Sequence, residues 1–211
     1  MDVERERKHM VQSQIIARGI TDPKIITAMQ KIPRHLFVPE EYQEMAYEDH
    51  PVAIGCGQTI SQPYIVALML EAVHPHASHS LLEIGSGSGY LLAIASLLFE
   101  QVVGIERVEE LYQQSLVSLE KAAVQNVRVL CADGYEGVEG PFDAIIVSCS
   151  CPEPPPFLLE QLKEGGILAA PIGDAIFQEL LTFRRVDNQF ERSSLGMVRF
   201  VPLISPHIPL L

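Results

Sequence analysis

The sequence lacks three features that would each have pointed to a particular class of protein. It contains no run of eighteen apolar residues, and its start, "MDVERERKHM", is charged, so neither a membrane span nor a secretory signal is indicated. Its four cysteines show no C-x-x-C spacing, which argues against a zinc or redox site and predicts reduced, mostly buried thiols. We therefore expect a cytoplasmic protein with no membrane partner and no metal.

Clustered cations are scarce as well. The net charge is −12, and residues 41–211 carry eight Lys and Arg against 22 Asp and Glu, whereas residues 1–40 carry seven against five. Binding to a phosphate backbone requires clustered cations, so nucleic acid is not an expected partner. An acidic body suits a cationic small molecule, although acidic surfaces more often only aid solubility.

The length of 211 residues, with 47% hydrophobic residues, predicts a single domain, 1–211. We divide it into a helical N-terminal segment, 1–75, and a sheet, 76–211. In the first part, residues 9–19 predict a helix ended by Gly19, and Asp22-Pro23 predicts the cap of a second helix. Residues 32–55 are interrupted by proline and predict an irregular connection.

Short apolar runs dominate the chain after residue 80. Four of them, 81–84, 102–106, 127–133 and 142–148, alternate with helical stretches, as βαβ units require. Later runs predict strands at 165–172, 179–186 and 198–204, the last two as antiparallel partners at one edge. The predicted fold is α/β, a doubly wound, mostly parallel sheet with a helical N-terminal extension.

The strongest chemical signal is the stretch "LLEIGSGSGY". A strand carrying Glu83 leads into Gly85, Gly87 and Gly89, and a helix follows at once, so backbone N–H groups can closely approach a ligand. The spacing G-x-G-x-G is one residue shorter than the G-x-G-x-x-G motif of dinucleotide enzymes.

Acidic residues end the next two strands. Glu106 could accept both hydroxyls of a ribose, and Asp133-Gly134 could border an adenine edge, at the strand ends where doubly wound sheets bind ligands. Each feature also has an ordinary explanation: an ion pair of Glu106 with Arg107, a plain turn at Asp133-Gly134, and tight helix packing at Gly89. Their combination favours a nucleoside-containing ligand.

The stretch "GQTISQPYI", residues 57–65, is polar but carries no charge. Ser61 as a helix N-cap and Pro63 in the first turn explain two of its residues. Gly57, Gln58 and Thr59 remain unexplained by a helix start.

The strand-end pattern resembles the Rossmann-like S-adenosylmethionine-dependent methyltransferases. The segments "RGITDPKIITAMQKIPRHLFVP", "AYEDHPVAIGCGQTISQPYIVALMLE", "LLEIGSGSGY", "FDAIIVS" and "VRFVPL" further resemble the protein-L-isoaspartate O-methyltransferases, in the same order and from about Met10 to Leu203. One departure is the segment from Ser148 to Cys151, where that family's pattern has a Thr-Ala-Ala-like segment.

The resemblance implies an enzyme that methylates the α-carboxylate of L-isoaspartyl residues in damaged proteins and so starts their repair through a succinimide. It implies Ser61 as the catalytic residue, with Thr59 and Ile54 beside it at the substrate. For S-adenosyl-L-methionine it implies the following binding residues: Gln58, Thr59, Ile60, Glu83, Gly85, Ser86, Gly87, Gly89, Glu106, Arg107, Asp133 and Gly134. The expected partners are isoaspartyl proteins and peptides, and the expected state is a monomer.

Such a reaction needs no general base. A carboxylate with a pKa of about 4 is already ionised at neutral pH, so the site has only to orient it with neutral donors, which Thr59 and Ser61 supply. Two other functions compete. One is a methyltransferase for a small molecule or RNA, with Asp49-His50 as its base rather than as a loop anchor; the other is a nicotinamide oxidoreductase or a nucleotide-binding module.

Overall fold

A seven-stranded sheet forms the centre of the computed structural model, which describes residues 2–135, 138 and 140–205. Its strand order is β5-β4-β3-β6-β7-β8-β9. The strands are β3 (Ser80–Ile84), β4 (Gln101–Glu106), β5 (Val127–Cys131), β6 (Phe142–Val147), β7 (Leu162–Gly173), β8 (Gln178–Val186) and β9 (Gln189–Val198). β3 to β7 are parallel, and β8 and β9 are antiparallel additions at one edge. This confirms the predicted α/β fold with a mostly parallel sheet.

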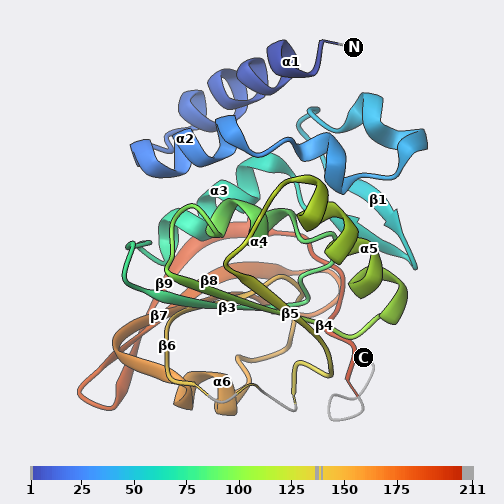
Figure 1. Cartoon of the computed structure of the whole chain (residues 1–211). Coiled ribbons are helices and arrows are strands. Elements are labelled where there is room, and N and C mark those ends of the chain that lie inside the picture. The colour runs from blue at the N-terminus through green and yellow to red at the C-terminus, as the bar shows by residue number, and fades with distance from the viewer. Residues whose placement is uncertain (1, 136–137, 139, 206–211) are drawn as a thin grey trace.

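Helices lie on both faces of this sheet, as Figure 1 shows. One face is covered by α3 (Pro63–Ala72), α4 (Tyr90–Ala95) and α5 (Glu109–Lys121), and the other by α6 (Pro156–Glu160). The central strand β3 is buried on both faces after its first residue, as expected for a covered parallel strand. The sheet therefore presents its carboxyl-end loops, rather than a face, to ligands.

The N-terminal helices form an outer layer over α3 and α4 (Figure 1). α1 (Val3–Met10) starts earlier than predicted because the Asp2 side chain accepts a hydrogen bond from the Arg5 N–H at 3.1 Å. It continues through a π-helical turn (Val11–Ile15) and a 3₁₀ turn (Ile16–Arg18) to Gly19, whose φ of 95° ends it. α2 (Pro23–Lys31) has the predicted cap, with Asp22 accepting from the Lys24 N–H at 2.7 Å.

The connection predicted as irregular contains short regular elements. Two 3₁₀ helices, η3 (Arg34–Phe37) and η4 (Glu40–Met45), lead into a hairpin of β1 (Val52–Gly55) and β2 (Gln58–Ile60). The pairing of Val52 with Ile60 places the first part of the neutral polar stretch in a two-stranded sheet that is separate from the main sheet. The division into segments 1–75 and 76–211 stays a prediction.

The strand predicted at 198–204 is wrong: β9 occupies 189–198, and the chain afterwards makes only an isolated bridge, between Pro202 and Ser150. Asp187 and Asn188 have φ values of 51° and 61°, the left-handed pair that a two-residue hairpin turn requires. β9 is an edge strand and its residues are exposed up to Met197, so it carries few of the apolar residues by which buried strands are recognised.

The cysteine prediction is half wrong. All four cysteines are free thiols, but Cys56 and Cys131 are exposed and only Cys149 and Cys151 are buried. Cys56 lies in the turn between β1 and β2 and Cys131 ends β5 near the sheet edge, which are positions that the hydrophobicity of cysteine alone does not indicate.

Candidate active site

The glycine loop between β3 and α4 has a backbone that only glycine adopts readily. Gly85, Gly87 and Gly89 have φ values of 76°, 50° and 82°. A Cβ on Gly85 would lie 3.2 Å from the Cys149 sulfur, and one on Gly87 would lie 3.3 Å from the Ile54 side chain. The loop is therefore packed closely from behind, and its backbone is left to face a ligand.

Glu106 fastens this loop to the neighbouring strand. Its Oε2 accepts from the Gly87 N–H and its Oε1 from the Val108 N–H, both at 2.8 Å, and the residue is 6% exposed. Arg107, considered as an ion-pair partner of Glu106, pairs instead with the Asp133 carboxylate, at 3.6 Å. Each Glu106 oxygen keeps a lone pair for a further donor.

A cavity of about 260 Å³ opens beside Glu106 at the carboxyl ends of the strands; we call it the strand-end cavity. It is lined by residues from β2, the glycine loop, the ends of β4 and β6 and the segment after β9: Gln58, Thr59, Ile84, Gly85, Gly87, Ile105, Glu106, Arg107, Val108, Gly134, Ser148, Cys149, Val201, Pro202, Leu203 and Ile204. It brings together backbone, a buried carboxylate and apolar walls.

Two further hollows adjoin it. A cavity of about 40 Å³, here the inner cavity, lies against Ile60, Ser61, Glu83, Ser86 and Tyr90. A wider one of about 730 Å³, here the α3–β9 groove, runs between α3 and the β8–β9 hairpin and is lined by Ser61, Tyr64, Phe177 and Met197 among others. Thr59 and Ser148 line all three hollows. These two hydroxyl residues therefore mark the place where the hollows meet.

Ser61 does not cap α3, contrary to the simpler sequence explanation. The N-cap is Gln62, and Pro63 at the first helical position has no N–H to be capped. The Ser61 carbonyl accepts from Arg34 Nη2 at 2.8 Å, while its hydroxyl makes no hydrogen bond with the described residues. That hydroxyl has no role in the local structure and lies where the inner cavity meets the groove.

Glu83 is a second buried acid at the site. It is 2% exposed; its Oε1 accepts from the Ser148 hydroxyl at 2.6 Å, and its Oε2 has no hydrogen-bond partner among the described residues. Burial raises the pKa of Glu83 to about 8, which the Ser148 hydrogen bond partly opposes and the Glu106 charge reinforces. An unpaired buried polar oxygen of this kind can form a hydrogen bond with a ligand.

The candidate base, Asp49-His50, is occupied in holding its loop. Asp49 accepts from Gln62 Nε2 at 2.7 Å and pairs with Arg18 at 3.3 Å. His50 bonds the Pro51 carbonyl and the Glu48 carboxylate, each at 2.7 Å, and these two contacts raise its pKa. Neither Asp49 nor His50 lines the three hollows, which favours the loop-anchor interpretation.

The structure brings together most of the residues expected at the cofactor and the substrate, with three exceptions. Ile54 packs against Gly87 from behind, Gly89 packs against Leu119 and Ser115 of α5, and Asp133 accepts from the Tyr135 N–H at 2.9 Å. None of these three lines the hollows described above. Their binding roles stay predictions.

Sequence reasoning missed other lining residues. The sequence marks Ser148 only as a departure from the family's pattern, and it predicts a strand for Val201 to Ile204. Gln178 holds this last segment, since its side chain accepts from the Phe200 N–H at 2.6 Å and donates to the Phe200 carbonyl at 3.1 Å. No local signal in the sequence indicates that a residue of β8 supports a cavity wall.

The described residues contain neither a metal-binding cluster nor a membrane-spanning helix. Among the described residues, no group of three or more His, Cys, Asp or Glu side chains is arranged to hold a metal ion. No helix in the same part of the chain is long and apolar enough to cross a membrane.

The sheet, its glycine loop and the acidic strand end define a Rossmann-like methyltransferase. The chain belongs to the protein-L-isoaspartate(D-aspartate) O-methyltransferase family, whose model matches residues 5–207. This confirms the resemblance found in the sequence.

Curated relatives and a solved structure agree with this assignment. A protein-L-isoaspartate O-methyltransferase of Methanospirillum hungatei is 45% identical over 201 residues, 94% of this chain and 93% of the relative. One from Pelotomaculum thermopropionicum is 48% identical over 202 residues, 94% of this chain and 88% of the relative. A Plasmodium falciparum structure described as this enzyme with S-adenosyl-L-homocysteine has a TM-score of 0.83 at 28% identity, covering 94% of this chain and 98% of its own.

The buried Glu83 predicts a pH-dependent stability in the absence of ligand. Its folded-state pKa lies above its unfolded value of 4.5, so its contribution is complete below pH 4.5 and is lost as the pH rises through about 8. Glu83→Gln keeps the oxygen that accepts from Ser148 and removes this loss. We expect the variant to gain on the order of 2 to 4 kcal/mol over wild type between pH 5 and pH 9.

The measurement is urea unfolding of both proteins at several pH values without cofactor. A constant difference between the two unfolding free energies across this range would contradict the assignment.

Proposed function

We propose that this protein transfers a methyl group from S-adenosyl-L-methionine to the free α-carboxylate of an L-isoaspartyl residue in a protein or peptide. The observation that carries the proposal is the meeting of the strand-end cavity and the α3–β9 groove at Thr59 and Ser148, with Ser61 beside them. Neutral hydroxyls thus lie between a nucleoside-sized cavity and an open groove.

The residues of the strand-end cavity fit the cofactor. Glu106 has lone pairs for ribose hydroxyls, and the backbone of Gly85 and Gly87 lines the cavity. Among the described residues lining the strand-end and inner cavities, Glu83 and Glu106 are acidic, and the basic Arg107 is paired with Asp133. With a pKa of about 8, Glu83 is mostly neutral at pH 7, so the Glu106 carboxylate is the group that suits a ligand with a positive sulfur and an ammonium group.

The groove fits a polypeptide. It carries unusually exposed apolar side chains, Ile176 at 80%, Phe177 at 68% and Met197 at 65%, next to Arg18 stacked on Tyr64. Exposed apolar groups that are clustered rather than scattered mark binding surfaces. The groove is open to solvent, so a chain can bind across it without entering the strand-end cavity.

The chemistry requires orientation more than proton transfer. When bound, S-adenosyl-L-methionine supplies a methyl group made electrophilic by its sulfonium. The Ser61 and Thr59 hydroxyls would hold the substrate carboxylate with one oxygen directed at the bound cofactor, where an O–C bond would form as the S–C bond breaks and its electron pair stays on sulfur. Well-oriented reactants can gain roughly 7 to 11 kcal/mol from proximity alone. The methyl ester then loses methanol to give a succinimide, part of which opens to normal aspartate.

Three properties of the protein belong to the same proposal. We place it in the cytoplasm, which the four free thiols support. It acts as a monomer. It does not use nucleic acid as a partner, which its net charge of −12 supports.

Substrate selectivity is the first prediction from this function. Of two peptides that differ only in an Asp or an isoaspartyl residue, only the isoaspartyl peptide should accept a radioactive methyl group from S-adenosyl-L-methionine. Equal labelling of the two peptides, or of neither, would refute the substrate. Calorimetry should at the same time detect S-adenosyl-L-homocysteine but not NAD, because the glycine spacing is too short for a dinucleotide pyrophosphate.

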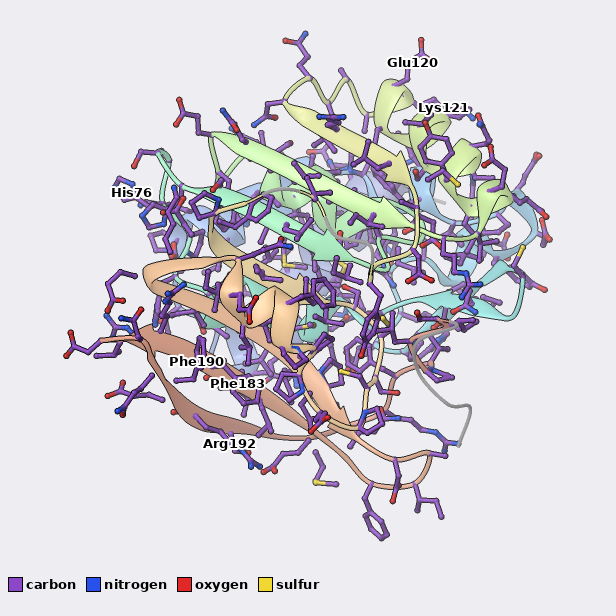
Figure 2. All side chains as sticks on the ribbon, turned by 90° about the horizontal axis from the view of Figure 1, so that it is seen from below. His76, Glu120, Lys121, Phe183, Phe190 and Arg192 are labelled. Atoms are coloured by element: carbon purple, nitrogen blue, oxygen red, sulfur yellow. The ribbon has the colours of Figure 1, made fainter. Side chains whose placement is uncertain are left out.

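Glu106→Ala should weaken S-adenosyl-L-homocysteine binding at least tenfold. The substitution removes the carboxylate that faces the ribose, and it also frees the Gly87 N–H, so the melting temperature should fall as well. A suitable control is Glu120→Gln on α5, whose side chain points away from the sheet (Figure 2) and should leave the affinity unchanged. Wild-type affinity in a folded Glu106→Ala protein would remove Glu106 from the cofactor site.

Ser61→Ala should lower kcat/KM for the isoaspartyl peptide by roughly one to two decades, the scale of one well-aimed hydrogen bond near the transition state. Cofactor affinity and melting temperature should stay close to wild type, because the hydroxyl bonds to nothing in the described structure. His50→Gln tests the rival base: its pH profile of kcat should coincide with that of wild type between pH 6 and 8. A rising limb that disappears in His50→Gln would favour the rival methyltransferase.

A further inference from the structure

Arg34, the first residue of η3, is the one fully buried cation among the described residues, at 0% exposure. No carboxylate of the described residues lies within 4 Å of it. Burial lowers the pKa of Arg34 to about 10, so the guanidinium stays protonated at neutral pH. The protein therefore buries a full positive charge without a counter-ion, directly behind the proposed site.

The guanidinium contacts three segments, two of which line the inner cavity. Its Nε donates to the Ala46 carbonyl at 2.7 Å and its Nη2 to the Ser61 carbonyl at 2.8 Å. Its central carbon lies 4.9 Å from the ring centre of Tyr90, which opens α4 directly after the glycine loop. Ser61 and Tyr90 both line the inner cavity. Arg34 thus holds the backbone of the substrate side against the start of the cofactor-side helix.

The Ser61 carbonyl depends on this contact. Ser61 lies between β2 and α3, so neither element supplies it with a partner, and no backbone N–H of the described residues donates to its carbonyl. Arg34 therefore orients the peptide group between Ser61 and Gln62, which is attached to the Cα that carries the Ser61 hydroxyl group. A shift of this peptide would move the hydroxyl relative to the three hollows.

Stability alone does not account for an arginine here. Burying a charge costs free energy, and apolar residues of similar volume are often at least as stabilising as a buried ionic group. What an apolar residue cannot provide is a rigid, planar fork that donates to two carbonyls in fixed directions. The geometry therefore favours a role in fixing the site.

We infer that Arg34 is a positioning residue for methyl transfer: by its hydrogen bond to the Ser61 carbonyl it sets the direction of the Ser61 hydroxyl toward the substrate carboxylate. The inference rests on the proposed function and adds to it a residue that acts only through Ser61. Such a residue has two signatures. It affects turnover more than cofactor binding, and its effect disappears when the Ser61 hydroxyl is absent.

The test is a double-mutant cycle of Arg34→Met and Ser61→Ala, with kcat and KM for the isoaspartyl peptide and calorimetry with S-adenosyl-L-homocysteine. Arg34→Met should lower kcat about tenfold and leave the cofactor dissociation constant within about twofold. In the Ser61→Ala background the same change should lower kcat by less than about twofold, because coupled residues are not additive. Additive effects, or a normal kcat in folded Arg34→Met, would overturn the inference.

Two further variants keep the result interpretable. Arg34→Lys retains the charge but not the fork, and should reproduce most of the kcat loss; it carries the cycle if Arg34→Met does not fold. Arg185→Met is the matched control, since Arg185 also donates to a carbonyl, that of Leu162 at 2.7 Å, away from the three hollows. It should leave kcat unchanged. The proposed function is tested separately, by labelling of the Asp and isoaspartyl peptides with the wild-type protein. If the wild type labels only the isoaspartyl peptide but the effects in the double-mutant cycle are additive, the role of Arg34 is refuted and the proposed function is not.

Discussion

The site depends on the buried carboxylate of Glu106 and its two backbone hydrogen bonds. One oxygen holds the Gly87 N–H and the other the Val108 N–H, so a single side chain connects the end of β4 with the glycine loop and the entry to α5. Moving the loop would leave a buried charge unpaired, which is costly. The glycines permit several backbone conformations of the loop, and these two hydrogen bonds select one of them.

A second constraint comes from the chemistry of the acceptor. A carboxylate needs no help to become a nucleophile, so a site for it requires direction rather than basicity. The β1–β2 hairpin meets this need by placing Thr59 at the strand-end cavity, and Ser61, just after the hairpin, lies at the inner cavity and the α3–β9 groove. The candidate base pair, Asp49 and His50, is engaged elsewhere, Asp49 with Gln62 and His50 with Glu48.

The buried part of the fold could be predicted from sequence because its signals are local. Strands such as β3 are short apolar runs, and the residues that define the glycine loop follow one another closely in the sequence. β9 could not be predicted in the same way, because an exposed edge strand has a polar composition and depends on the turn at Asp187-Asn188. The cap assigned to Ser61 failed for a related reason: a serine two residues before Pro63 fits a cap locally, but pairing with β1 keeps the chain extended as far as Ile60. The contributions of Ser148, Gln178 and Arg34 come from contacts between distant segments, which no single stretch of sequence records.

Thr59, Ser148 and Val201 belong at once to the strand-end cavity and to the α3–β9 groove. They lie where the two hollows adjoin, so a ligand in the cavity and a chain in the groove would meet at these three residues. A chain that binds in the groove therefore reaches the site without entering the strand-end cavity. The volume of that cavity thus limits the size of the methyl donor and places no limit on the size of the protein that carries the acceptor carboxylate.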